Sequence, residues 1–194
     1  MSETISVLLV CDGDDQDTLE RSLLSLVTQA GDFHLHIHVQ NIGQDALKLA
    51  PFLAQWQARL GAPETIIYCR DVWLSYENSP ATGFNTALCE GSERLSGNAD
   101  NFMGWLRVGD VFLPGALAHV AQLAQQFSAQ QLSWVQGAAG QLSDEKLIAG
   151  ILLHSPTALV ARGLCDGVHW PAVFWGGMFF RTGLWRAAQA HIAF

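Results

Sequence analysis

The residues best suited to chemistry stand where apolar segments end. Residues 105–110 read Trp-Leu-Arg-Val-Gly-Asp, so an apolar segment runs into an arginine and an acidic turn, and Pro-Gly follows at 114–115. In an α/β protein this pattern places Asp110 at the carboxyl end of a strand, where open parallel sheets bind their ligands. A carboxylate there can hold a divalent cation. The guanidinium of Arg107 either neutralises a diphosphate directly or points to solvent.

Polar residues also follow the first two apolar segments. Asp12 comes after residues 5–10, and Gln40 and Asn41 come after residues 33–39. Because the carboxyl ends of parallel strands meet at one edge of a sheet, Asp12 is a candidate nucleotide contact. The amides of Gln40 and Asn41 can hydrogen-bond a base, although they carry no charge. The further acidic residues after Asp12 have a plainer explanation, since carboxylates stabilise the start of a helix.

Three histidines, His34, His36 and His38, alternate with apolar residues in the second segment. His-x-His spacing is compatible with zinc. No other cluster of ligand residues accompanies them, so we interpret the three histidines as the half-exposed polar face of a strand.

A regular alternation of elements must position these residues. Apolar runs predict strands at 5–10, 33–39, 65–69, 102–106 and 132–136, with a strand or buried segment at 146–153. Apolar residues at helical spacing predict helices at 17–29, 45–60, 114–127 and 182–192, and another beginning within 82–88. Pro114 is expected in the first turn of its helix. The alternation indicates one α/β domain, residues 1–194, with a doubly wound, mostly parallel sheet.

The composition narrows the classes of function. Of 194 residues, 49% are apolar and only 14% are charged, and the formal net charge is -8. A nucleic-acid-binding protein would carry a basic stripe, which is missing here. The apolar surplus predicts a surface that meets a partner, a membrane face or a missing part of the protein. The four cysteines lack metal-ligand spacing, and no signal peptide or transmembrane segment is evident, which favours a cytoplasmic protein with reduced thiols.

Several segments together resemble the family 2 glycosyltransferases of the GT-A fold, and they come in the order that the family has. Residues 5–10 are followed by Ser-Leu-Leu-Ser-Leu-Val-Thr-Gln at 22–29, as in the opening of that family. Residues 77–88 resemble its Asn-x-Gly…Ala-x-Asn-x-Gly-Leu segment, and residues 105–117 resemble its central Leu-Asp-x-Asp-Asp block with the helix after it. Residues 168–175 and 181–185 resemble a later block on the acceptor side.

The resemblance implies a GT-A-like, Rossmann-type three-layer sandwich that binds a nucleotide-diphospho-sugar and transfers its sugar to a saccharide or lipid-linked acceptor in polysaccharide biosynthesis. Such a protein works in the cytoplasm or at the inner face of the membrane. The implied donor-side residues are Asp12, Gln40, Asn41, Asn85, Arg107 and Asp110, with Asp110 also the one candidate ligand of Mg²⁺ or Mn²⁺. On the acceptor side the resemblance implies His169 and Trp170. For Asn85 and His169 a purely structural role is the alternative, and for Trp170 it is packing in the core.

The sequence also departs from this family. Arg107 and Gly109 stand where two carboxylates usually stand, and the amides at 40–41 replace an Asp pair. The Glu-Asp pair that supplies the family's general base does not occur after Asp166, and inverting transfer needs a base within reach of the acceptor. We therefore expect the chain to be the donor-binding part of a protein truncated at its C-terminal end, and inactive by itself.

The main rival is a non-catalytic glycosyltransferase-like module with a degenerate metal site, which serves binding or assembly. Under either function, the apolar surplus reflects a homo-oligomer, a membrane-facing surface or a missing C-terminal region. A nicotinamide-binding domain is disfavoured, because the first turn lacks Gly-x-Gly-x-x-Gly.

Overall fold

A six-stranded, mostly parallel sheet forms the centre of the protein. The structure is a computed structural model. It describes residues 2–12, 16–43, 46–79, 83–127, 132–138, 140–143, 146–149, 162 and 175–189. The strands, in their order across the sheet, are β3 (Asp71–Asn78), β2 (Phe33–Asn41), β1 (Glu3–Cys11), β4 (Phe102–Arg107), β8 (Met178–Arg181) and β5 (Trp134–Gln136). The four strands β1 to β4 are parallel, whereas β8 runs antiparallel to both of its neighbours. A separate antiparallel pair consists of β6 (Gly140–Ser143) and β7 (Lys146–Ala149).

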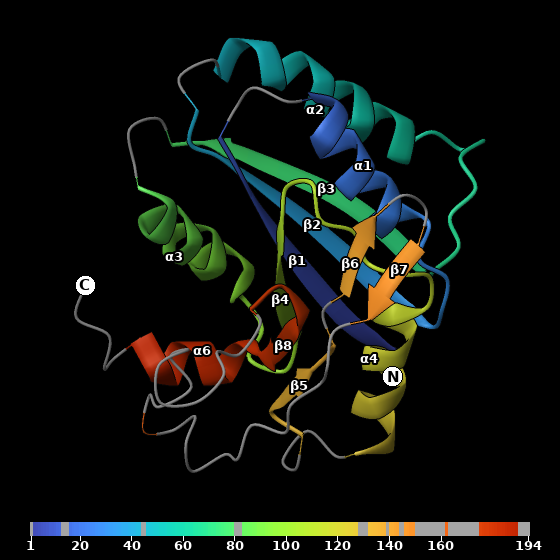
Figure 1. Ribbon diagram of the computed structural model, residues 1–194, viewed down its shortest axis with the longest axis vertical. Helices are drawn as coiled ribbons and strands as arrows, with labels where there is room; N and C mark the ends of the chain where they lie inside the picture. Colours follow the sequence, from blue (N-terminus) through green and yellow to red (C-terminus); the bar gives the residue numbers. More distant parts are fainter. Residues whose placement is uncertain are drawn as a thin grey trace.

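Helices cover both faces of this sheet, so the fold is a three-layer α/β sandwich, as the sequence predicts. Figure 1 shows α1 (Gln16–Val27), α2 (Ala46–Leu60) and α4 (Ala116–Gln126) on one face, and α3 (Phe84–Leu95) and α6 (Thr182–Gln189) on the other. A single 3-10 turn, η1 (Trp175–Gly177), leads into β8.

Successive side chains of each strand point to opposite faces of the sheet, so a hydrophobic core forms on each face. In β1, Ile5, Val7 and Leu9 point toward α1, α2 and α4, while Leu8 and Val10 belong to a second cluster on the α3 and α6 face. All five side chains are at most 7% exposed, as expected for a central parallel strand that is buried on both faces.

The third strand lies further along the chain than the sequence predicts. Residues 71–78 form β3, whereas residues 65–69 form no strand. In the latter segment Ile67 and Cys69 pack against the core, but Ile66 and Tyr68 are 74% and 55% exposed. Buried and exposed side chains therefore alternate along residues 65–69 as they would in a strand, but the segment does not join the sheet. The true strand is an edge strand covered on one face, and its charged and polar outer positions conceal it from a search for apolar runs.

Two further strands and the start of one helix also differ from the prediction. Strand β8 was not expected, because its four residues lie inside an aromatic, glycine-rich stretch, and β6 was not expected either. Pro114 lies in a turn before α4 rather than in the helix, because Gly115 is the N-cap residue. Residues 150–153 and 157–161 of the less regular region lie outside the described residues.

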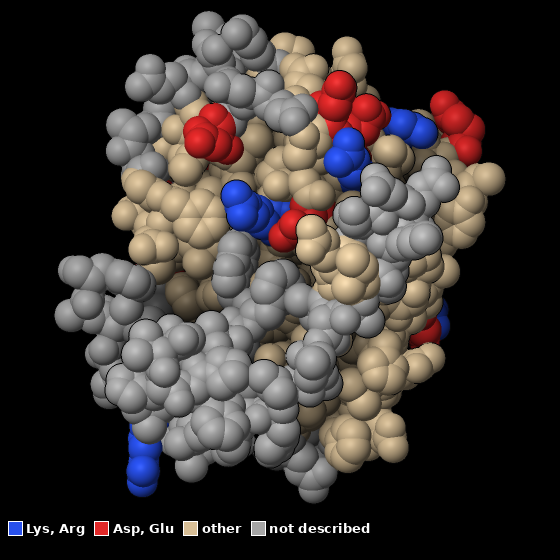
Figure 2. All heavy atoms as spheres, in the orientation of Figure 1, with Lys and Arg blue, Asp and Glu red and all other residues tan. Residues whose placement is uncertain are grey.

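Within the described part of the chain, no helix combines the length and the apolar character needed to cross a membrane. Figure 2 shows one face of the molecule, on which most of the blue Lys and Arg side chains lie beside red Asp and Glu in the upper half, while one stands alone at the lower edge. This mixture of signs agrees with the absence of a basic stripe in the sequence.

Candidate functional site

The carboxyl ends of the four parallel strands meet at one edge of the sheet. The strand register pairs Cys11 with Asn41, Asn41 with Asn78, and Val10 with Arg107. Strand β1 lies between β2 and β4. The chain that follows β1 therefore crosses to one side of it, and the chain that follows β3 returns to the other side. This is the point of an open α/β sheet at which ligands bind. We call the region after these four strand ends the carboxyl edge.

Three of the predicted site residues lie at the ends of the neighbouring strands β1 and β4. Asp12 comes directly after β1, and Arg107 is the last residue of β4, with Asp110 three residues further on. All three side chains are exposed, so two carboxylates and a guanidinium are open to solvent at the ends of adjacent strands. Together they could bind a group that carries both phosphate oxygens and hydroxyls.

Helix α1 holds the backbone of the turn at 109–110. The hydroxyl of Ser22 donates to the carbonyl oxygen of Asp110 at 2.9 Å and accepts from the amide of Gly109 at 2.8 Å. The amide of Asp110 donates to the carbonyl of Arg107 at 2.9 Å. The backbone of Asp110 is therefore bonded on both sides while its carboxylate stays exposed.

The same face of α1 holds the segment that follows. The hydroxyl of Ser25 accepts from the amide of Phe112 at 3.3 Å. Gln29 donates to the carbonyl of Leu113 at 3.0 Å, and its side-chain oxygen accepts from the amide of Leu117 at 3.2 Å. Leu117 lies in the first turn of α4, whose N-cap residue is a glycine without a capping side chain, so Gln29 supplies the missing acceptor.

Sequence reasoning did not assign a role to Ser22, Ser25 or Gln29. Ser22 and Ser25 lie on one face of α1, and Gln29 follows two residues after the helix ends. Polar residues on the inner face of a helix are the signal that could have revealed this contact with a loop. Three of the polar positions in the 22–29 segment are thus explained by the turn and the segment that they hold.

Gly109 is required by the backbone and by α1. Its φ is +97°, a left-handed conformation that side chains rarely adopt, and an added Cβ would lie 2.8 Å from Cγ2 of Thr18. The chain therefore has no room for a carboxylate at 109 without a local shift. Arg107, in contrast, is exposed at the strand end.

Gln40 and Asn41 reach the carboxyl edge, but their side chains are fully buried. Gln40 donates to the hydroxyl of Ser79 at 2.7 Å, and Asn41 donates to Oδ1 of Asn78 at 3.0 Å and accepts from the amide of Gly43 at 3.0 Å. The two amides connect the ends of β2 and β3 beneath this edge. Their partners at 78–79 could not be placed from sequence, because the third strand was expected at 65–69.

A chain of hydrogen bonds runs along the α3 face of β2 and β3 to Gln40. Ser75 Oγ lies 2.7 Å from Nε2 of His36 and 2.9 Å from Nδ1 of His38, and Nε2 of His38 lies 3.1 Å from Oε1 of Gln40. Because Oε1 of Gln40 can only accept, His38 carries its proton on Nε2 and accepts from Ser75 through Nδ1. The bonds thus satisfy two neutral imidazoles.

Burial explains why these imidazoles stay neutral. Desolvation, with a smaller contribution from His38, lowers the pKa of His36 to about 4. Desolvation also lowers the pKa of His38, against the opposing effects of the Gln40 hydrogen bond and of Glu77. His34 instead contacts the hydroxyl of Ser2, with 3.0 Å between Nε2 and Oγ.

The described residues do not assemble a metal site by themselves. No group of three His, Cys, Asp or Glu side chains among them is arranged to hold an ion, and the three histidines of β2 form no such group. Asp110 is the single carboxylate of its turn, so a cation there would take its remaining ligands from water or from the phosphate oxygens of a bound ligand.

The remaining predicted residues lie at the margin of the site or outside the described chain. Asn85 is exposed in the first turn of α3, which begins soon after β3 ends at the carboxyl edge, and the N-cap residue Gly83 provides no side-chain cap. His169 and Trp170 lie outside the described residues. The structure therefore brings Asp12, Arg107 and Asp110 to one edge, with Gln40 and Asn41 beneath it.

Comparison of the sequence with models of known protein families gives no match, and a comparison with curated proteins gives none either.

Proposed function

We propose that this chain is a glycosyltransferase family 2-like domain that binds a nucleotide-diphospho-sugar at the carboxyl edge. The observation that carries the proposal is the convergence of Asp12 with Arg107 and Asp110 at the ends of the adjacent parallel strands β1 and β4. This place in an open α/β sheet suits a nucleotide. The resemblance described above supplies the class of ligand.

Each residue then has a distinct role. The guanidinium of Arg107 neutralises the diphosphate of the donor, and Asp110 would reach the same group through a divalent cation that the phosphates help to hold. Asp12 contacts the nucleoside, and Asn85 contacts the donor from the start of α3. Gln40 and Asn41 shape the floor of the nucleoside pocket, because their amides are already bonded within the protein.

In the intact system the acceptor hydroxyl displaces the nucleoside diphosphate directly at the anomeric carbon. Charge develops on the leaving diphosphate, which the guanidinium of Arg107 stabilises. His169 and Trp170 would face a saccharide or lipid-linked acceptor. No residue of this chain is assigned as the general base, so we expect the chain alone to bind the donor without transferring its sugar.

A second function has its own support. A non-catalytic module with the same fold would need no second carboxylate, and a side chain at Gly109 would require a strained backbone and a shift of Thr18. The internally satisfied amides of Gln40 and Asn41 also suit a module that keeps its fold but has lost contacts with a base.

A calorimetric screen of UDP, GDP, TDP and CDP, each with and without Mn²⁺, separates the two functions. A ligand that binds the native state raises its melting temperature by mass action. We expect a shift with one nucleotide that is lost in both Asp110→Ala and Arg107→Ala. Asp100→Ala is the matched control, because Asp100 is an exposed aspartate just before the opposite end of β4.

The pattern of losses identifies how the diphosphate is held. A shift that needs Mn²⁺ and disappears in Asp110→Ala supports a cation, whereas a shift without Mn²⁺ that disappears in Arg107→Ala supports direct neutralisation. A folded protein whose melting temperature moves with none of the four nucleotides contradicts donor binding and favours the non-catalytic module.

A further inference from the structure

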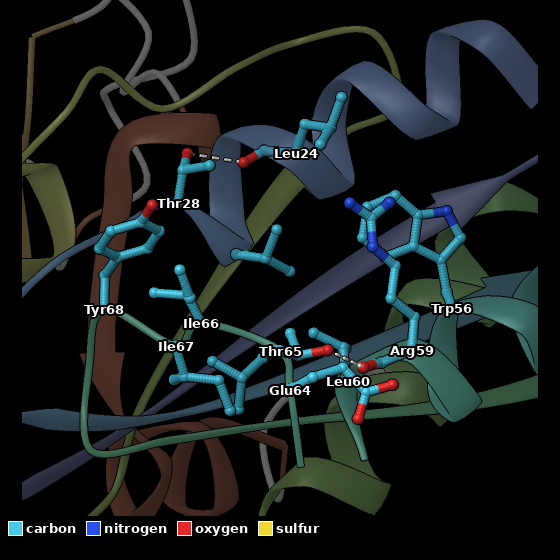
Figure 3. A pocket seen from close by; sticks show the side chains of 12 residues that line it. Leu24, Thr28, Trp56, Arg59, Leu60, Glu64, Thr65, Ile66, Ile67 and Tyr68 are labelled. Atoms are coloured by element: carbon cyan, nitrogen blue, oxygen red, sulfur yellow. Dashed lines mark hydrogen bonds between the residues drawn. The ribbon is translucent and has the colours of Figure 1, made fainter. Parts of the chain in front are cut away.

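An apolar groove lies between the C-terminal parts of α1 and α2 and the segment at 61–70, away from the residues of the candidate site. Its volume is about 440 Å³. Figure 3 shows Trp56 and Arg59 at one side of this groove and Tyr68 at the opposite side. The lining residues are Leu24, Val27, Thr28, Trp56, Arg59, Leu60, Glu64, Thr65, Ile66, Ile67, Tyr68 and Val72.

Large apolar side chains project around the groove. Ile66, Tyr68 and Leu24 are 74%, 55% and 41% exposed, and the three together form a patch of the kind that usually meets a partner. The same surface thus carries a hollow and, beside it, the projecting side chain of Ile66.

The backbone of this segment is held in place. The amide of Gly31 donates to the carbonyl of Tyr68 at 3.2 Å, and the amide of Arg70 donates to the carbonyl of Phe33 at 2.9 Å. The hydroxyl of Thr65 donates to the carbonyl of Arg59. The exposed side chains are therefore presented on an ordered support, which lowers the entropy lost on association.

The groove carries one charge of each sign. Arg59 stacks over the Trp56 ring, with 5.1 Å between its central carbon and the ring centroid, and Glu64 follows in the next turn of the chain. Both residues are exposed, and within the described residues neither is in an ion pair. The lining as a whole is neutral, although the chain carries a formal charge of -8.

We propose that this groove is the interface of a symmetric homodimer, in which Arg59 of each copy meets Glu64 of the other. A twofold interface places the same patch on both subunits, so the patch must complement itself. A twofold axis midway between Arg59 and Glu64 sets opposite charges against each other twice, and Ile66 of one copy then packs against the apolar side of the other groove. Local neutrality removes the repulsion that the overall charge would impose on two copies.

Charge exchange tests this pairing. Arg59→Glu and Glu64→Arg each set like charges against each other, so each variant alone should raise the dimer Kd at least about tenfold. An equal mixture of these two variants restores opposite charges at both contacts and should form a heterodimer. The double variant Arg59→Glu/Glu64→Arg should dimerise like the wild type. Sedimentation velocity over a concentration series measures all of these states.

Apolar substitutions test the centre of the interface. Ile66→Asp should also raise the dimer Kd at least about tenfold, because it places a charge at a desolvated contact. Ile148→Asp is the matched control, since Ile148 on β7 is 60% exposed and does not line the groove. It should leave the dimer intact. Far-UV circular dichroism and melting temperature show that each variant is folded.

Three results would overturn the proposal. The first is a wild-type protein that stays monomeric throughout the series. The second is a dimer that Ile66→Asp leaves unchanged, which would assign self-association to another face. The third is a pair of charge variants that dimerise separately as well as they do when mixed. A monomer that binds a different protein through Ile66 would likewise assign the groove to that partner.

Discussion

The hydroxyl of Ser22 donates a hydrogen bond of 2.9 Å to the backbone carbonyl of Asp110, although 88 residues separate the two in sequence. The same hydroxyl accepts from the amide of Gly109. The position of the Asp110 carboxylate at the carboxyl edge therefore depends on α1 as much as on its own strand. A substitution inside α1 should therefore alter the turn that carries Asp110.

Ser22→Ala tests this dependence. The substitution leaves an amide and a carbonyl of the turn without their partner, so the free energy of unfolding should fall by about 1–3 kcal/mol. Urea denaturation measures the loss. Thr86→Val is a suitable control, because Thr86 is exposed on α3 and does not line the groove. Equal denaturation midpoints for Ser22→Ala and the wild type would show that the turn does not need this hydroxyl.

Gly109→Asp restores the carboxylate that the resemblance leads one to expect. We predict a loss of stability of about 1–3 kcal/mol, because a side chain at φ +97° is strained and its Cβ meets Thr18. Gly97→Asp is the control, since a Cβ there meets nothing within 4 Å. Thermal denaturation compares the two, and an unchanged melting temperature in Gly109→Asp would contradict the steric explanation for the missing carboxylate.

The neutral histidines of β2 predict how stability depends on pH. The folded state lowers the pKa of His36 from 6.5 to about 4, so the unfolded chain takes up a proton first as the pH falls. The resulting stability is fully present above pH 6.5 and is lost as the pH falls toward 4. Since His36 is only partly buried, we expect this contribution to be of order 1 kcal/mol.

His36→Gln isolates that contribution. Glutamine keeps a donor for Ser75 without a group that titrates in this range, so the variant should lose less stability between pH 7 and pH 4 than the wild type does. Urea denaturation at several pH values gives both curves. His34→Gln is the control, because His34 lies near the start of the strand and contacts Ser2. Parallel curves for His36→Gln and the wild type would refute the assignment.

Two arginines with different surroundings give a contrast in stability. Arg181 is 6% exposed, lies 3.0 Å from a carboxylate oxygen of Glu3, and stacks 4.2 Å from the centre of the Phe102 ring. Arg181→Met leaves Glu3 partly buried without its partner, which should cost about 3–5 kcal/mol. Arg70→Met breaks an exposed pair with Asp32, which solvent screens, so it should change the free energy of unfolding far less. Equal losses in chemical denaturation would contradict this contrast.

The sequence predicts those parts of the fold that are buried or strongly periodic. Strand β1, helix α2 and helix α4 agree with expectation to within a few residues, because continuous burial and helical spacing leave clear patterns. Strand β3 was misplaced, since its outer face is polar and the neighbouring apolar segment lines a groove instead. The four-residue strand β8 is too short to carry a pattern of its own.

In the candidate site, too, the sequence predicts some residues and misses others. Asp12 and Asp110 were predicted at the ends of strands, because that placement follows from the alternation of strands and helices. The roles of Ser22 and Gln29 depend on which loop a helix meets, and sequence spacing does not contain that information. The burial of Gln40 depended on residues of a strand that had been placed elsewhere.

The place of β8 in the sheet sets an order of assembly during protein synthesis. Strands β1 to β4 are paired with one another and can join as they leave the ribosome, whereas β5 pairs only with β8 among the described strands. Until residue 181 has been made, the β4 edge stays open and β5 has no neighbour. Chains that stall before that residue expose an unpaired parallel edge, so they should be the species that needs chaperones most.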